Sequence, residues 1–173
     1  RLLLGLTYFQ GPVMLVLSRQ KLPILDRSSM GAADSTLKGA YILQKESGDH
    51  PELILIATGS EVQLIVAAQE KLEADGIPTR TVSMPCWEVF RAQEAAYRDE
   101  VLDPGCANRI AVEAASPQGW EEWVGEKGHV IGISGFGSSA PAKELFTHYG
   151  FTVDHVVSEA KKMAGREVGS QAS

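Results

Sequence analysis

The sequence predicts an α/β fold in which helices cover both faces of a mainly parallel sheet of about five strands, in three layers. Short apolar runs with the composition of strands alternate with segments whose apolar residues recur at helical spacing. The 173 residues suit one domain, since domains run to roughly 100–200 residues. Apolar residues make up 44% and charged residues 22%, as is typical of a soluble globular protein.

The first 35 residues do not fit this alternation. Residues 1–11 begin without Met and lack the features of a signal or transit peptide, and Tyr8–Gly11 resemble the string left by a tag-removing protease, so they are excluded from fold reasoning. Val13–Leu17 has the length and content of a fully buried strand. Lys21–Thr36 contains Pro23, a serine pair and no steady period, which favours a linker.

The main body supplies the remaining elements. The expected strands are Tyr41–Leu43 at an edge, Leu53–Ala57, Thr79–Met84, Arg109–Glu113 and His129–Ile133. Helical patterns follow Ser60, run broken from Val89 to Leu102, open at Pro117, follow a tight turn at Gly135–Pro141, and begin near Thr152.

Two turns between a strand and a helix are candidates for binding an anion. Gly59 and Ser60 follow the strand Leu53–Ala57, where free backbone donors and a helix dipole meet. Ser60 with Gln63 also forms a capping box, which explains the turn equally well. Gly137 and Ser138 lie in a loose G-x-G-x-x-A pattern that suits a pyrophosphate. A plain glycine turn with a serine cap is the favoured interpretation there, because no further strand completes a dinucleotide-binding unit.

Charge and composition disfavour several function classes. Sixteen Lys and Arg against 22 Asp and Glu give a formal charge of −6, which offers no attraction to nucleic acid. The two cysteines, Cys86 and Cys106, form no C-x-x-C, so a reducing cytoplasmic setting fits best. The four histidines show no metal-ligand spacing, no G-x-S-x-G elbow occurs, and no run is long enough to span a membrane. No metal site and no catalytic residue is expected in this chain.

Arg19 is a separate candidate. It follows an apolar strand, and side chains at the carboxyl ends of parallel strands reach ligand crevices. Its planar guanidinium matches a phosphate group, although an exposed arginine at the end of a strand is the simpler interpretation.

Several strings together resemble the C-terminal part of transketolase. They include Leu17–Pro23 (LSRQKLP), Gly39–Leu43 (GAYIL), Ala57–Val62 (ATGSEV), Phe136–Pro141 (FGSSAP) and Tyr149–Thr152 (YGFT). The resemblance extends from about Gly11 to Ala164 in register, which makes it far more specific than any one motif.

The resemblance implies a division of the chain and a role for it. Residues 12–35 would hold the last strand of a preceding pyrimidine-binding domain and a linker, residues 36–167 a transketolase-like C-terminal domain, and residues 168–173 a flexible tail. The full enzyme would transfer a two-carbon ketol unit from a ketose phosphate to an aldose phosphate, in the pentose phosphate pathway or Calvin cycle. This fragment would serve folding, assembly or regulation.

Cofactors and partners also follow from the resemblance alone. Thiamine diphosphate and Mg²⁺ or Ca²⁺ would be held by the earlier domains of a homodimeric enzyme, and the fragment would bind neither. The family's LSRQ arginine, which binds the substrate phosphate, corresponds to Arg19. Two alternatives stay open: the C-terminal domain of another thiamine diphosphate enzyme, such as a 2-oxo-acid dehydrogenase subunit or deoxyxylulose phosphate synthase, and a small regulatory domain that binds a phosphate or nucleotide.

Overall fold

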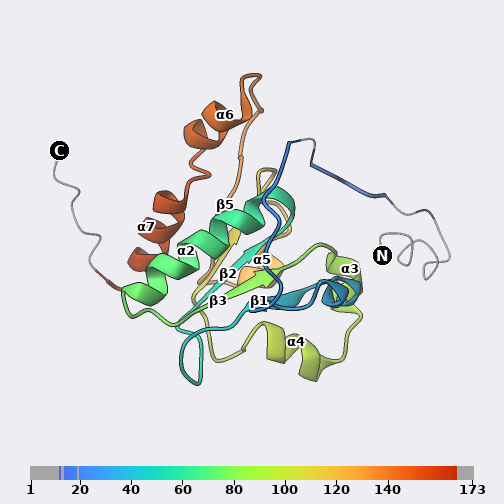
Figure 1. Ribbon diagram of the computed structural model, residues 1–173, viewed down its shortest axis with the longest axis vertical. Coiled ribbons are helices and arrows are strands. Elements are labelled where there is room, and N and C mark those ends of the chain that lie inside the picture. Colours follow the sequence, from blue (N-terminus) through green and yellow to red (C-terminus); the bar gives the residue numbers. More distant parts are fainter. Residues whose placement is uncertain (1–11, 13, 19, 167–173) are drawn as a thin grey trace.

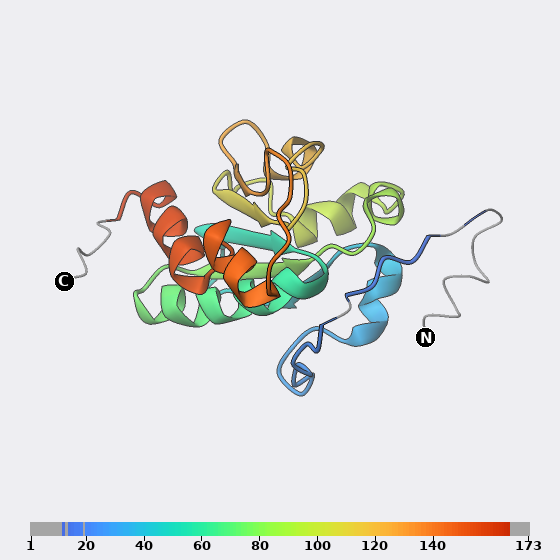
Figure 2. The same ribbon diagram turned by 90° about the horizontal axis from the view of Figure 1, so that it is seen from above.

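A five-stranded sheet lies between two layers of helices in the computed structural model, which describes residues 12, 14–18 and 20–166 (Figures 1 and 2). The strand order is β1-β3-β2-β4-β5. Four strands are parallel, and β1 pairs with β3 in the antiparallel sense at one edge. The predicted three-layer α/β fold is confirmed. The strands are β1 (Tyr41–Gln44), β2 (Leu53–Ala57), β3 (Thr79–Ser83), β4 (Arg109–Val112) and β5 (His129–Ile131).

The helices divide between the two faces of the sheet. One face carries α2, α6 and α7, and the other carries α3, α4 and α5. Their bounds are η1 (Ala33–Lys38), η2 (Gly59–Glu61), α2 (Val62–Ala74), α3 (Trp87–Arg91), α4 (Ala95–Val101), α5 (Glu121–Val124), α6 (Ala142–His148) and α7 (Val153–Met163).

Two apolar cores fill the spaces between the layers. The strand β2 is buried at all five positions, and its alternate residues serve the two cores: Ile54 and Ile56 pack toward α3–α5, whereas Leu55 packs toward α2 and α7. Trp120 and Trp123 are both buried in the first core. A continuous apolar run therefore marks the central strand, because helices cover both of its faces.

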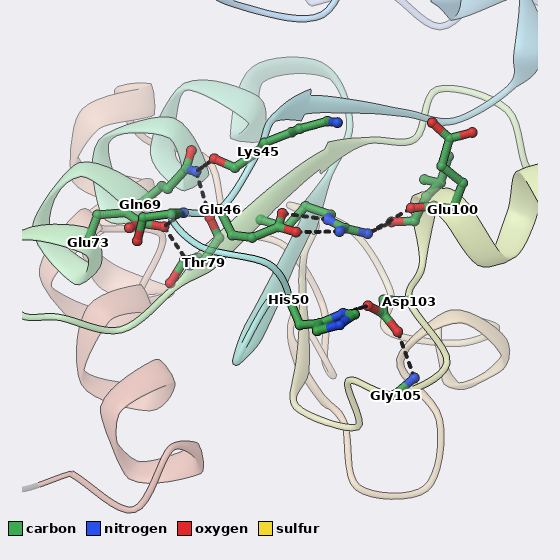
Figure 3. Close-up of polar contacts among 12 residues, drawn as sticks. Lys45, Glu46, His50, Gln69, Glu73, Thr79, Glu100, Asp103 and Gly105 are labelled. Carbon is green, nitrogen blue, oxygen red and sulfur yellow. Dashed lines mark hydrogen bonds and ion pairs between the residues drawn. The ribbon is translucent and has the colours of Figure 1, made fainter.

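The amino edge of the sheet, where the parallel strands begin, is closed by a buried polar network (Figure 3). Arg80 at the start of β3 makes two hydrogen bonds to Glu46, at 2.8 Å and 2.5 Å, and a third to the carbonyl of Glu100 at 2.7 Å. Gln69 of α2 donates to the carbonyls of Lys45 and Thr79. Burial alone would raise the pKa of Glu46, but the bonds to Arg80 hold it below its usual value.

Several local predictions differ from the structure. The helix predicted to open at Pro117 begins at Glu121, because Pro117 starts a turn in which its carbonyl accepts from the Trp120 N–H. The predicted tight turn at Gly135–Pro141 is an open, exposed segment. A short 3-10 helix, η1, lies partly inside the predicted linker.

The predicted strand Val13–Leu17 does not form. Val13 lies outside the described residues, and Met14–Leu17 have no regular secondary structure and are exposed. A strand needs a neighbouring backbone to pair with, and none of the described residues 14–17 pairs with one. Its assignment to a preceding domain stays a prediction. Residues 1–11 and the tail, 168–173, also lie outside the described residues.

Candidate functional site

The candidate site is the carboxyl edge of the sheet, defined as the segments that follow the parallel strands: Thr58–Glu61 after β2, Met84–Cys86 after β3, Glu113–Ser116 after β4 and Gly132–Pro141 after β5. The helix that follows β2 covers one face of the sheet, and the helix that follows β4 covers the other. The adjacent strands β2 and β4 therefore flank a topological switch point, where doubly wound α/β folds bind ligands.

A glutamate of the chain itself fills this switch point. Glu61 is only 3% exposed, and its carboxylate accepts a hydrogen bond from the Ser60 hydroxyl. Burial raises its pKa, whereas Ser60 and the backbone of Ala114, just after β4, stabilise the charged form. Glu61 thus links the turn after β2 to the end of β4.

A second carboxyl lies beside it. Glu113 directly follows β4, and its backbone N–H donates to the carbonyl of Ile131 at 3.1 Å, which holds it at the sheet. Burial and the negative charge of Glu61 raise the pKa of Glu113 to about 7. Two carboxyl groups that share a site cannot both ionise easily, so this pair keeps a proton into the neutral range.

The turn at Gly59 and Ser60 has the expected position but a different local structure. The predicted capping box is absent, because η2 precedes α2 and moves the start of that helix to Val62. The Gln63 side chain donates to the Ser60 carbonyl at 3.1 Å instead. Gly59 has a φ of 57°, a conformation that glycine adopts without strain.

A groove of about 380 Å³ lies beside this turn, between it and Leu22–Leu25, with Arg27 in its wall. The guanidinium of Arg27 gives the groove one positive charge. The buried carboxylate of Glu61, however, lies next to the turn and would repel a phosphate. Anion binding at Gly59 and Ser60 stays a prediction.

Gly137 and Ser138 do not form a helix N-terminus. The helix α6 begins at Ala142 with Pro141 as its N-cap residue, so the expected serine cap is absent. The Ser138 hydroxyl lies 2.8 Å from that of Tyr149. A Cβ built on Gly137 would meet no atom within 4 Å. Anion binding at this second turn also stays a prediction, without a dinucleotide fold to support it.

Arg19, the predicted phosphate ligand, lies outside the described residues. The residues on either side of it, Ser18 and Gln20, lie at the carboxyl edge. The Ser18 hydroxyl lies 4.0 Å from a Cβ built on Gly59. Gln20 lines a hollow of about 310 Å³ together with Gln63 of α2 and Phe146 of α6. The chain therefore enters the domain over this edge.

Two kinds of site were sought among the described residues: a cluster of metal ligands and a membrane-spanning helix. Among them, no group of three or more His, Cys, Asp or Glu side chains could hold a metal ion. No helix that the structure describes is long and apolar enough to cross a bilayer. Burial raises the pKa of the Cys106 thiol, which makes it a poor nucleophile.

Sequence reasoning missed three residues at this edge. Glu61 and Glu113 each follow a buried strand that ends at the switch point, and that position is the signal that could have found them. Phe136 is 99% exposed, and its position between two glycines in a loop is the signal that could have indicated this exposure.

The fold and its carboxyl edge define a doubly wound α/β domain with a switch point between β2 and β4. A family model described as the transketolase-like C-terminal domain matches residues 39–152. Transketolase from Sinorhizobium medicae is 49% identical over 156 residues, which is 90% of this chain and 22% of that protein. Transketolase 1 from Escherichia coli is 47% identical over 159 residues, or 92% of this chain and 24% of that protein.

The crystal structure of transketolase from Pichia stipitis in complex with sedoheptulose 7-phosphate has a TM-score of 0.74 and 34% identity. The match covers 85% of this chain and 20% of the Pichia stipitis protein. The chain belongs to the transketolase-like C-terminal domain family. It spans between a fifth and a quarter of the length of the transketolases that it matches.

Proposed function

We propose that this chain is the C-terminal part of a transketolase that transfers a two-carbon ketol group from a ketose phosphate to an aldose phosphate. The observation that carries the proposal is the alignment with complete transketolases, at 47–49% identity over nine-tenths of this chain. The whole protein would be a cytoplasmic homodimer, and its pathway would be the pentose phosphate pathway or Calvin cycle.

Under this proposal, the chemistry belongs to the part of the protein that precedes this chain. Thiamine diphosphate would supply the carbanion chemistry there, together with Mg²⁺ or Ca²⁺. Under the same proposal, the role of the carboxyl edge is to fold, position and join the domains. We expect the isolated chain to bind neither cofactor nor sugar phosphate tightly.

Arg19 would bind the phosphate of the sugar in the complete enzyme. A guanidinium can bind phosphate through two hydrogen bonds, and contact with this non-reacting group orients the ketose. The substitution Arg19→Ala in the complete enzyme should raise the KM for phosphorylated acceptors at least tenfold. It should leave the KM for a non-phosphorylated aldehyde nearly unchanged.

The experiment that tests the proposal starts from the complete reading frame around this chain. The encoded protein, supplied with thiamine diphosphate and Mg²⁺, should convert ketose and aldose phosphates by two-carbon transfer. A reading frame that encodes no upstream domains, or a complete protein without this activity, would contradict the proposal. Calorimetry on the 173-residue chain should show no micromolar binding of thiamine diphosphate.

The regulatory alternative has one observation in its favour, the groove beside Gly59 and Ser60. A thermal-shift screen of this chain with phosphates and nucleotides separates it from a purely structural role. A ligand at 100 times its Kd would add about 2.7 kcal/mol to the free energy of unfolding. A purely structural domain would show no shift.

A further inference from the structure

Phe136 is the most exposed large apolar side chain at the carboxyl edge, at 99%. It lies in the open segment between β5 and α6, which projects beyond the strand ends (Figure 1). A Cβ built on either neighbour, Gly135 or Gly137, would meet no atom within 4 Å. The phenyl ring therefore stands in water with no contact from its own domain to explain an aromatic residue there.

The backbone under this ring is nevertheless held in place. The Tyr149 hydroxyl lies 3.2 Å from the carbonyl of Phe136 and 2.8 Å from the hydroxyl of Ser138. Gly137, Ser138 and Phe146 also line a small hollow of about 160 Å³ beneath the loop. A ring in solvent on a supported backbone is arranged in advance for an outside contact, which lowers the entropy cost of binding.

The N-terminal segment leaves the domain beside α6, the helix that follows this loop. Gln20 shares a hollow with Lys143 and Phe146 of α6, the helix that directly follows the loop. Further upstream, Met14 and Val16 are each 86% exposed. Whatever precedes this segment is tethered to the carboxyl edge and reaches the loop at a high effective concentration.

We propose that Phe136 is an anchor that inserts into an apolar recess on the upstream part of the same polypeptide. The proposal rests on the proposed function, under which the chain spans 22% of a transketolase such as that of Sinorhizobium medicae and most of the protein precedes it. Buried aromatic anchors contribute most of the binding energy at interfaces. The tether favours this occupant over a second copy of the chain, which would have to be captured from solution.

A photo-crosslink in the complete protein tests this contact. A p-benzoylphenylalanine residue replaces Phe136, and the product is digested and mapped by mass spectrometry after irradiation. We expect a crosslink within one polypeptide to a residue upstream of position 12. The matched control is the same substitution at Asp49, an exposed loop residue at the amino edge, which should give less than a tenth of that yield.

Three results would overturn the proposal: a crosslink between two polypeptides at this position, a crosslink confined to residues 12–166, or a yield no higher than at Asp49. A second variant provides an independent check. Phe136→Ser in the complete protein should speed amide exchange of residues 134–140 at least tenfold, toward the rate in the isolated chain. Unchanged exchange would contradict the anchor.

These results can be separated from a failure of the proposed function. Two-carbon transfer by the complete protein tests the function and does not depend on where Phe136 makes contact. An active enzyme without the crosslink would refute the anchor alone. A reading frame without upstream domains would refute both.

Discussion

The two edges of the sheet differ in how they satisfy their polar and apolar groups. At the amino edge, the side chains of Arg80, Glu46 and Gln69 form hydrogen bonds with one another or with backbone carbonyls. All of these hydrogen bonds lie within the domain. At the carboxyl edge, the buried carboxyl group of Glu61 lies beside the half-buried carboxyl group of Glu113, and Phe136 stands in solvent. One edge is complete within the described chain, whereas the other has groups that a neighbouring domain would complete.

This difference indicates which face of the domain meets the rest of the protein. A network in which every charge is paired gains nothing from a partner, because any contact would first have to break it. An exposed aromatic ring and an unpaired apolar segment gain free energy when they are covered. The predictions below probe the two edges in order of the effect expected.

The largest effect is expected from Glu46→Gln at the amino edge. The variant leaves the guanidinium of Arg80, which is 7% exposed, without its charged partner. We expect the free energy of unfolding, measured by urea denaturation, to fall by about 3 kcal/mol. Glu122→Gln breaks an exposed pair with Arg91 and serves as the control, for which little change is expected. If both variants lost the same free energy of unfolding, burial of the Glu46–Arg80 pair would make no contribution to stability.

A smaller, pH-dependent effect is expected at the carboxyl edge. The pKa of Glu113 is raised from 4.5 to about 7 in the folded state. Between these values the unfolded state binds fewer protons than the folded state, so the free energy of unfolding falls as the pH rises through this window. It is independent of this group below pH 4.5, where both states are protonated, and above about pH 7, where both are ionised.

Glu113→Gln should remove this slope, because the amide is neutral at every pH. At pH 8 the variant should be more stable than the unmodified chain by an amount on the order of 2 kcal/mol. Urea denaturation at half-unit pH steps measures the difference, and Glu126→Gln, at an exposed position, is the control. A slope of undiminished size in Glu113→Gln would place the proton elsewhere, since the buried Glu61 alone accounts only for a smaller one.

Tyr149→Phe should loosen the loop without unfolding the domain. The variant loses the hydroxyl that contacts Phe136 and Ser138, and the expected cost is below about 1 kcal/mol. Amide exchange of residues 134–140 should become several-fold faster. Tyr97→Phe removes a hydroxyl that donates to the Ala40 carbonyl at 2.9 Å and should leave this exchange unchanged. Loop exchange that responds equally to both variants would contradict the specific role of Tyr149.

The smallest effect is expected from Phe136→Ser in the isolated chain. Because the ring contributes no burial, the free energy of unfolding should stay within about 0.5 kcal/mol of its starting value. Phe90→Ala, at a fully buried position in the core, should cost about 3–5 kcal/mol in the same measurement. A clear loss of stability in Phe136→Ser would mean that the ring packs against its own domain.

The fold could be predicted from the sequence wherever burial on both faces leaves a pattern. The apolar run Leu53–Ala57 predicted both ends of the central strand correctly. The amphipathic spacing after Thr152 predicted α7, and Thr152 is the N-cap residue of that helix. Helix starts were harder. Ser60 and Gln63 fit a capping box, yet a 3-10 turn precedes the helix and Gln63 donates to the Ser60 carbonyl.

The site could be predicted only in part, because its groups meet through the fold. Gly59 and Ser60 were correctly placed after a strand, but nothing in their spacing indicates that Glu61 would be buried beside Glu113, which lies far along the chain. That pairing follows from the strand order, which places β4 next to β2. Met14–Leu17 show the reverse case, since a sequence with strand composition forms no strand without a neighbour to pair with.

Hydrogen exchange compared between this chain and the complete protein tests the central claim most directly. If the carboxyl edge faces the upstream part, amides of residues 134–140 should exchange at least tenfold more slowly in the complete protein, while those of residues 47–50 at the amino edge should exchange at the same rate in both. Equal exchange of residues 134–140 in the two proteins, or protection that appears only at residues 47–50, would contradict the account.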